Sequence, residues 1–585
     1  MSCICEIRHP LGMAIVLFSS FACANEPSAN NSGVQPVADQ RADPSAASST
    51  LGKSSGLSGN AAEPQVTDSG TKKSAEPLHK PPLVIDKRTT YFLKPLRPDG
   101  YPDYFAALND HCSGTTTVDD NAAVPLIQAF GPESVSPGIQ ELYFNLLGIN
   151  VLPSVGNYFV RSQEMTERWV KGTFQPADGE QADALQAQFA VAAGQPWAAD
   201  EYPMVAEWLS INEGPLQLIA EASRRTHYYE PIVSPSQSLP SLYSVAMPLE
   251  QSLGEITLAL QARAMLLAKS GKIDAAWNDL ITCHRCLRLM GRVPLGQYSV
   301  ETRTSEISLC QTELKLLHYC HPSLKQTERM RADMATLPQL SRLADRIDLG
   351  DRLRFLDAVC VLDRKGPAAL QQLFGETSLT AEESSLPKAV SELLFDWNEP
   401  LRMGNEWFDR ETAVYRMTDR VEREKALQQI HVDLEQMSAD ASSPGIFALN
   451  WFTKKSAKAA FGRVVGASLL QLFDNETPGI LNIADQLEVH RAFTEAGMAL
   501  AAYRAENGQY PERLDELVPK YIAQLPRDLY GDHPPLHYRR ESNGYLLYSV
   551  GPNGRDEQGG TSENFPDSDD ISLFITDAPA SASDK

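Results

Sequence analysis

The sequence predicts a mainly α-helical body followed by a small C-terminal α+β domain, in which a long helix packs on a short antiparallel sheet. Apolar residues recur at helical spacing from about residue 139 to residue 472. After residue 485, one more amphipathic stretch is followed by turn residues and two short runs of strand-forming residues. A chain of 585 residues has room for roughly two to four domains, and its 42% hydrophobic content allows a large core.

The balance of charge excludes some classes of partner. The formal net charge is −23 at pH 7. Nucleic-acid binding depends on Lys and Arg side chains that replace the counterions condensed on phosphate. The excess of carboxylates therefore argues against a nucleic-acid partner and against adsorption on anionic lipid. An acidic chain of this kind stays soluble and attracts cations.

Residues 1–24 have the pattern of an export signal peptide. Arg8 precedes an apolar run from Leu11 to Phe21, which is long enough for a signal core and too short to span a bilayer. Ala22-Cys23-Ala24 has the small-x-small cleavage pattern, so the mature chain is expected in the periplasm or outside the cell. Lipidation at Cys23 and an uncleaved anchor are the two alternatives. No later segment has the ~18 apolar residues of a membrane helix, so no transmembrane segment is expected in the mature chain.

Residues 25–82 are expected to form a disordered linker, and residues 577–585 a disordered tail. The linker is dominated by Ser, Ala, Pro, Gly and Asn and contains no aromatic residue. Such a composition buries too little apolar surface to offset the entropy lost on ordering.

Residues 83–480 are expected to fold as one mostly helical domain or as two subdomains. The clearest helical pattern, residues 258–288, is interrupted once, at Ser270-Gly271. The surrounding segment, residues 255–290, resembles a helical hairpin of the tetratricopeptide type. Only one copy is recognisable, and solenoids need several stacked units, so a generic helical hairpin is the simpler interpretation.

Two charged helical segments lie further along this region. Residues 340–362 alternate acids and arginines with apolar positions, which predicts a solvated helix face with exposed ion pairs rather than a site for acid–base chemistry. Residues 454–473 carry four basic side chains beside an apolar stripe. A basic amphipathic helix can lie on a membrane or on a partner. In so acidic a protein, packing onto the body of the same chain is the expectation.

No motif in the sequence names an enzyme. H-E-x-x-H, G-x-S-x-G and a glycine-rich dinucleotide turn are all missing. Zinc-ligand residue types gather at Cys310, His318, Cys320 and His321, but without the spacing of a structural zinc module. The cysteines that remain after removal of the signal are expected to be buried structural residues or to form one disulfide, with the pairing left open: Cys112, Cys283, Cys286, Cys310, Cys320 and Cys360.

Several local signals agree in the C-terminal region, residues 481–576. Residues 485–504 are expected to form one amphipathic helix, and residues 514–518 a short second one. Residues 536–540 and 545–550 are expected as two strands joined around Asn543-Gly544, which is among the strongest short hairpin signals.

Three segments of this region, in this order, resemble the globular domain of type II secretion major pseudopilins. They are A-L-A-A-Y-R followed by N-G-Q-Y-P at residues 499–511, L-P-R-D-L-Y-G at residues 525–531, and the hairpin and glycine-rich loop at residues 544–554. The rest of the chain resembles uncharacterised large exported bacterial proteins. Pseudopilins begin with a hydrophobic helix that assembles them, whereas here the corresponding helix starts near residue 485 and is polar on one face. The resemblance therefore implies the domain but not its role in assembly.

In that family the loop after the last hairpin commonly binds calcium, so the resemblance implies a Ca²⁺ site here. Calcium is bound by carboxylate, amide and carbonyl oxygens. Asn553 stands where the family has Asp, which removes one charge, and a solvated acidic tail is the alternative. The implied ligands are the Val550 carbonyl, the Asn553 amide oxygen and the carboxylates of Asp556, Asp567, Asp569 and Asp570.

Together these patterns predict an exported, non-enzymatic protein with a structural or partner-binding role in the cell envelope. The alternative is an extracytoplasmic enzyme or substrate-binding protein with its site in the helical body. A deep pocket lined by convergent charged side chains would favour that alternative.

Overall fold

The structure is a computed structural model of the whole chain. The predicted signal, linker and tail lie outside the residues that it describes. Those residues are 83–173, 179–236, 238–366, 369, 373, 395–441, 443, 456–474, 477–531, 534–560 and 568–576.

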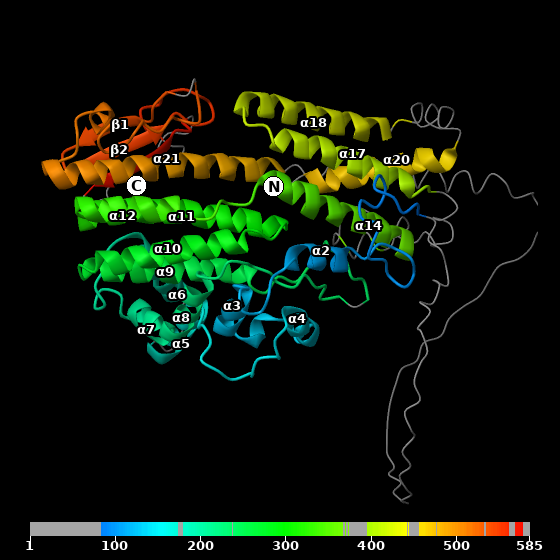
Figure 1. Cartoon of the computed structure of the whole chain (residues 1–585), viewed down its shortest axis with the longest axis horizontal. Helices are drawn as coiled ribbons and strands as arrows, with labels where there is room; N and C mark the ends of the chain where they lie inside the picture. The colour runs from blue at the N-terminus through cyan, green and yellow to red at the C-terminus, as the bar shows by residue number, and fades with distance from the viewer. Residues whose placement is uncertain are drawn as a thin grey trace, which may run out of the picture.

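The first part of the described chain is a set of short helices that covers one side of a longer helical stack (Figure 1). The longer helices α9 (Leu253–Lys269) and α10 (Ile273–Met290) follow them. The predicted interruption at Ser270-Gly271 is confirmed, because Gly271 has a φ of +74° in the turn between these two helices. The short helices are α2 (Tyr104–Ser113), α3 (Ala123–Phe130), α4 (Gln140–Leu147), α5 (Ser162–Thr173), α6 (Gly179–Gly194), α7 (Pro203–Ile211) and α8 (Glu213–Ala222).

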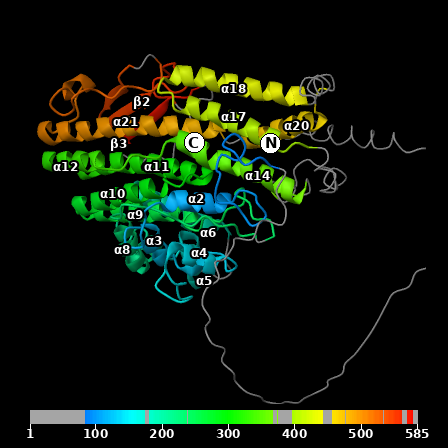
Figure 2. The same cartoon turned by 45° about the vertical axis from the view of Figure 1, so that its right-hand side comes forward.

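The stack continues from α9 and α10 through α11 (Gly296–Cys320) and α12 (Leu324–Ala335) to the long helix α21 (Thr477–Asn507). Helix α21 lies along α11 and α12, and α11 in turn packs on α10 and α9. Figures 1 and 2 show these helices as successive layers, with the C-terminal sheet on the outer side of α21. No helix among the described residues combines the length and the apolarity needed to cross a membrane.

A second group of helices packs beside the stack: α14 (Arg352–Lys365), α17 (Asn398–Tyr415), α18 (Arg420–Ala441) and α20 (Ala457–Asp474). The predicted basic helix is α20. It packs against α17 and α18 and buries Val464 and Leu469, so the expectation that it packs onto the body of the chain is confirmed. Lys454 and Lys455 lie outside the described residues.

The predicted solvated face of residues 340–362 is wrong. This segment forms the short helix α13 (Leu343–Asp345), the π-helical turn η4 (Arg346–Asp351) and the start of α14. Arg346, Arg352 and Asp357 are all buried. Some of the ion pairs lie within the segment, such as Arg346 with Asp351. Other segments cover these charges and add further partners, such as Asp409 for Arg352 and the Leu242 N–H for Asp357, which the sequence pattern of one helix cannot reveal.

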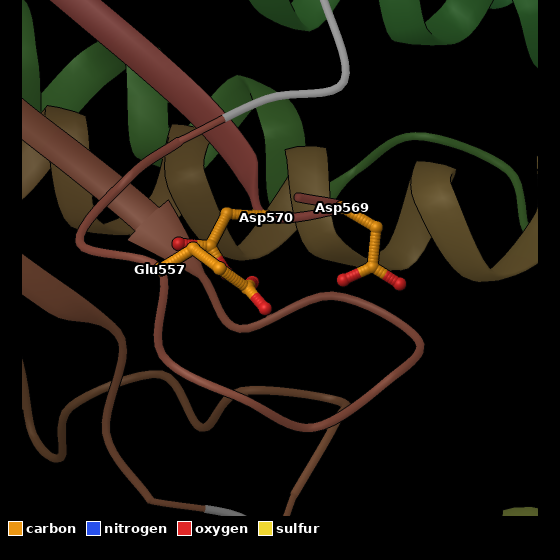
Figure 3. A group of neighbouring side chains, drawn as sticks. All are labelled: Glu557, Asp569 and Asp570. Carbon is orange, nitrogen blue, oxygen red and sulfur yellow. The ribbon is translucent and has the colours of Figure 1, made fainter. Parts of the chain in front are cut away.

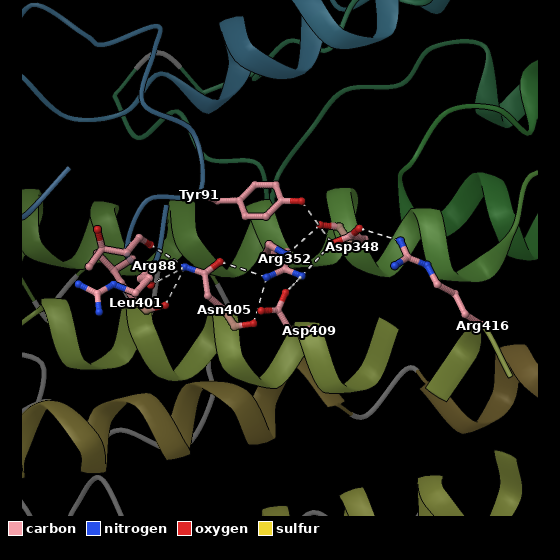
Figure 4. A network of polar contacts seen from close by, with 9 residues as sticks. Arg88, Tyr91, Asp348, Arg352, Leu401, Asn405, Asp409 and Arg416 are labelled. Atoms are coloured by element: carbon pink, nitrogen blue, oxygen red, sulfur yellow. Dashed lines mark hydrogen bonds and ion pairs between the residues drawn. The ribbon is translucent and has the colours of Figure 1, made fainter. Parts of the chain in front are cut away.

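Arg352 illustrates this burial (Figure 4). Its side chain is 1% exposed, and its guanidinium donates to the Asp348 carboxylate at 2.8 Å and to the Asp409 carboxylate at 2.7 Å. It also donates to the Asn405 carbonyl at 3.0 Å, and it lies 4.6 Å from the centre of the Tyr91 ring. The network joins the first described residues to α14 and α17, and a buried charge is tolerated only with such complete pairing.

The C-terminal residues form a small antiparallel sheet beside α21. Its strand order is β1 (His537–Glu541), β2 (Gly544–Ser549) and β3 (Ile571–Thr576). Glu541 pairs with Gly544 at the end of the predicted hairpin, which is confirmed, and the predicted short helix is the turn η6 (Leu514–Leu517). The third strand, β3, was not predicted. It pairs with β2, which is therefore central and buried along its length.

A second hydrophobic core lies between α21 and this sheet. It includes Phe493 and Leu500 of α21 and Leu547 of β2, and it also includes Leu314 of α11. Helix α21 begins before the predicted domain boundary at residue 481 and packs on the body and on the sheet. The C-terminal region thus shares its core with the helical stack.

Candidate functional site

Three carboxylates come together in the loop between β2 and β3. One oxygen each of Glu557, Asp569 and Asp570 lies within 4.8 Å of the other two. Figure 3 shows the carboxylates of Glu557 and Asp570 against each other, with Asp569 beside them. We call these three residues the acidic cluster. Two of the predicted calcium ligands, Asp569 and Asp570, belong to it.

Each acid of the cluster uses one oxygen to hold the loop. The Asn553 backbone N–H donates to Asp569 Oδ2 at 3.0 Å, and its side-chain Nδ2 donates to Glu557 Oε1 at 3.0 Å. The Gly559 N–H donates to Asp570 Oδ2 at 2.8 Å. The second oxygen of each acid is buried and has no hydrogen-bond partner among the described residues. Burial of such oxygens costs free energy unless a cation or a proton binds them.

Burial and neighbouring charge act together on Asp570, whose side chain is nearly inaccessible. Desolvation raises its pKa, and the nearby Glu557 and Asp556 carboxylates raise it further. The hydrogen bond from the Gly559 N–H opposes them. The resulting pKa of Asp570 is about 7. A carboxyl group whose pKa lies this far above its ordinary range indicates unbalanced negative charge at the cluster.

Local backbone features place the acids. Gly551 has a φ of +64°, and a Cβ at this position would lie 2.1 Å from the Asp569 carbonyl oxygen. The two passing segments of the loop therefore require glycine here. Asp528 is buried beneath them and accepts a hydrogen bond from the Val550 N–H at 2.9 Å. Sequence analysis did not single out Asp528 as a support of the loop.

The remaining predicted ligands lie elsewhere or have other partners. Asn553 Oδ1 accepts a hydrogen bond from the Arg555 N–H at 2.6 Å. Asp556 accepts one from the Tyr548 hydroxyl at 3.1 Å and lies 3.6 Å from His537 Nδ1. Asp567 lies outside the described residues. Glu557 was not among the predicted ligands, although its place in the same acidic loop was a signal that could have included it.

A second group of charged side chains surrounds a cavity of 370 Å³ between α10, α11, α12 and α21, which we call the charged cavity. His284 stands at its base between two carboxylates. Its Nδ1 is 3.0 Å from Glu306 and its Nε2 is 2.9 Å from Glu313. Arg288 Nε donates to Glu306 at 3.0 Å.

The electrostatics of this base favour charged forms of both His284 and Glu306. Burial lowers the pKa of His284, but the Glu306 and Glu313 carboxylates outweigh burial and raise it to about 9. Burial also raises the pKa of Glu306, and the nearby His284 and Arg288 outweigh that effect and lower it to about 2. An imidazolium that donates from both ring nitrogens is the consistent assignment.

The six cysteines of the described residues are free thiols, and four of them are buried, as expected for structural residues: Cys283, Cys286, Cys310 and Cys360. The acidic cluster is the one group of potential metal ligands among the described residues, so the histidines and cysteines near residue 320 do not converge on a metal. His318 instead lies 3.1 Å from the Tyr510 hydroxyl and joins α11 to the C-terminal region.

A larger cavity of 780 Å³ lies between α17, α18, α21 and the loops at Tyr530 and Pro552. Its arginines, Arg420 and Arg423, are both paired with Asp485, at 3.1 Å and 3.0 Å. Arg420 also lies 3.5 Å from the Glu424 carboxylate. Because two carboxylates pair with the two arginines, the cavity favours no particular ligand chemistry.

Comparisons with protein-family models, with curated proteins and with solved structures found no match to this chain.

Proposed function

We propose that this chain is an exported, non-enzymatic protein that binds partners in the cell envelope and carries a C-terminal α+β domain with a Ca²⁺ site at the acidic cluster. The observation that carries the calcium site is that Glu557, Asp569 and Asp570 each place one oxygen within 4.8 Å of the other two, and that each has a buried oxygen without a hydrogen-bond partner among the described residues. Three converging carboxylates without a cation repel one another, and a divalent cation removes that repulsion.

The chemistry of the ligand set favours calcium. Hard carboxylate oxygens suit Ca²⁺ and Mg²⁺, whereas zinc sites are built mainly from Cys and His. Calcium takes six to eight oxygens in an irregular shell, and magnesium demands a small, regular octahedron. A loop that offers three carboxylates from two separate segments fits the irregular shell better, with water or backbone carbonyls as the remaining ligands.

We interpret the C-terminal domain as pseudopilin-like, and this interpretation is supported by the packing of the long helix α21 and the sheet around one core. In a pseudopilus the assembling helix must be free to pack against other subunits. Here α21 packs on α11 and α12 along one side and contacts the sheet on another. We therefore propose that the domain is a fixed module of this protein, with its partners bound elsewhere than on α21.

The calcium site is tested on the purified full chain, by calorimetric titration with CaCl₂ after chelation and by the melting temperature with and without Ca²⁺. Binding to the folded state raises the melting temperature, and the rise grows with the logarithm of the ligand concentration above Kd. We expect Asp570→Asn to abolish the response. The exposed Asp515→Asn, whose side chain is 67% exposed, is the matched control and should keep the response. A wild-type melting temperature that is the same with Ca²⁺ and with chelator would refute the site.

Export is tested separately by cell fractionation and mass determination. The expected product begins after Ala24 and is found outside the cytoplasm. Full-length chain recovered from the cytoplasm would contradict export, and a lipid-sized mass increase at Cys23 would replace the soluble form by the lipoprotein alternative.

A second candidate function, binding of a small solute by the helical body, is favoured by one observation. The charged cavity gathers histidine, arginine and glutamate side chains around an opening of ligand size.

A further inference from the structure

We propose that the charged cavity binds a small organic anion, with Arg491 and Thr494 of α21 as the groups that hold its carboxylate or phosphate. This inference is independent of the calcium site, because the cavity lies on the other side of α21 from the sheet and shares no residue with the acidic cluster.

Two donors on one face of α21 line the cavity with hydrogen-bonding capacity left over. The Nε atom of Arg491 is buried and has no hydrogen-bond partner among the described residues. Thr494 follows one turn later and is 3% exposed. The Thr494 hydroxyl interacts with the Cys310 thiol, and sulfur is a weak hydrogen-bond acceptor that an oxyanion can replace. Residues three apart on a helix are neighbours on its surface, so both donors can reach one oxyanion.

The charges at the base of the cavity are already satisfied by one another. His284 and Arg288 pair with Glu306, and Glu313 lies behind His284 without lining the cavity. Arg288 NH1 also donates to the Pro338 carbonyl at 2.9 Å. These groups therefore form the base of the cavity, and their charges are balanced without a ligand.

An anion bound in the cavity would contact the cationic groups above this base. Arg331 of α12 faces the same cavity and donates one N–H to the Tyr521 carbonyl. Arg491 donates to Glu488 at 2.9 Å and lies 3.8 Å from Glu306. Glu495 is exposed at the rim. With His284 protonated, four cationic side chains line the cavity. Four carboxylates match them, those of Glu306 and Glu495 in the lining and those of Glu313 and Glu488 beside it. The Nε atom of Arg491, which has no partner among the described residues, therefore favours an anion more than the net charge does.

A neighbouring arginine adds a positive charge close to Arg491. Arg303 is buried, and its guanidinium donates to the uncharged oxygens of Ser299 and Ser341. Burial, and then the nearby charges of Arg346 and Arg491, lower the pKa of Arg303 to about 10. An anion beside Arg491 would relieve this repulsion between guanidinium groups.

Size and lining define the rest of the ligand. A volume of 370 Å³ corresponds to roughly a dozen water molecules, so the ligand is small. Met334, Ala335 and Met498 supply an apolar wall, and methionine adapts to ligands of varied shape. The cavity thus fits an oxyanion attached to a short alkyl or aryl group.

The test uses the purified full chain, with hexanoate, benzoate and phenyl phosphate as probes and hexanol, benzyl alcohol and phenol as their uncharged counterparts. Titration calorimetry and the melting temperature are measured at constant ionic strength in low chloride. At least one anion should bind one to one and raise the melting temperature, while its uncharged counterpart should not.

Variants assign that binding to the cavity. Arg491→Gln should weaken it about tenfold or more, because a charge-assisted hydrogen bond is lost. Thr494→Val keeps the shape and the charge of the site and should weaken it several-fold. Arg168→Gln, at an exposed helix position, should leave it unchanged. Circular dichroism and the melting temperature without ligand check that each variant is folded. Absence of binding by every anion, or unchanged binding in both folded α21 variants, would overturn the proposal.

Discussion

Leu314 of α11 packs against the backbone of Gly497 in α21, where no side chain separates the two helices. A Cβ atom at position 497 would lie 2.0 Å from Leu314 Cδ2. Leu314 is fully buried and belongs to the core of the C-terminal sheet. This contact therefore joins the helical body to the C-terminal region, and the close approach of the helices depends on glycine.

The first prediction concerns this contact. Gly497→Ala should not stabilise the protein and should lower the free energy of unfolding by up to about 2 kcal/mol. Alanine gains up to about 1 kcal/mol in helix propensity, but overpacking a buried site costs about 1–3 kcal/mol. Urea denaturation measures the difference.

Gly479→Ala is the matched control in the same helix, because a Cβ there meets nothing within 4 Å. It should be neutral or stabilising by up to about 1 kcal/mol. Equal stabilisation by both substitutions would show that the close approach at Leu314 is not required.

The second prediction concerns the buried network of Arg352. Arg352→Met should cost about 1–3 kcal/mol, because it leaves the buried oxygens of Asn405 without their donor. Asp348, whose side chain is 26% exposed, keeps its contact with Arg416. Arg416→Met removes a different partner of Asp348 from a side chain that is 55% exposed, and it should cost about 1 kcal/mol or less. Similar costs for both variants, measured by denaturant unfolding, would contradict a central role for Arg352.

The third prediction is a dependence of stability on pH that arises from His284. Its folded pKa of about 9 lies above the ordinary value of 6.5. The contribution of charged His284 to the free energy of unfolding is therefore fully present below pH 6.5 and is lost as the pH rises through about 9. The loss is on the order of 3 kcal/mol by the usual conversion of a pKa shift.

His284→Gln keeps a polar side chain without this titration. Unfolding free energies measured from pH 6 to pH 10 should fall more steeply for the wild type than for the variant. Glu306 determines where stability begins to fall at low pH. Its pKa is lowered from 4.5 to about 2, so its contribution is present above pH 4.5 and is lost as the pH falls toward 2. Parallel curves for wild type and variant between pH 6 and pH 10 would argue against a charged His284.

The fourth prediction separates charge repulsion from calcium binding at the acidic cluster. In the presence of chelator, Asp570→Asn should raise the melting temperature, because it removes one of three carboxylates that repel one another and adds a donor for Glu557. The same variant should show no further rise on addition of Ca²⁺. A variant that melts below the wild type in chelator would indicate that the three acids are not under mutual repulsion.

Much of the local architecture could be predicted from sequence, because short-range signals determine it. Gly271 permits the turn between α9 and α10. Ser542 and Asn543 join β1 to β2, one position from the predicted Asn543-Gly544 turn. The apolar stripe of α20 correctly predicted that this helix packs onto the body. In each case the residues that decide the structure are neighbours in the chain.

The candidate sites were predicted only in part. Asp569 and Asp570 were expected as ligands, whereas Glu557 joins them because the loop folds back on itself at Gly551. The charged cavity was not predicted at all. Its side chains come from the consecutive helices α10, α11 and α12 and from α21, which lies far along the chain from them. No motif within one of these helices indicates that they meet.

The sequence by itself determined the mainly helical composition, the hairpin at Ser270-Gly271 and the two-stranded hairpin near the C-terminus, because spacing and turn residues act over a few positions. Only the tertiary structure decided that the arginines of η4 and α14 are buried, that β3 completes the sheet, and that α21 belongs to both cores. The physical reason is that a charge is buried, or a strand paired, according to partners supplied by distant segments. Those partners exist only once the chain has folded.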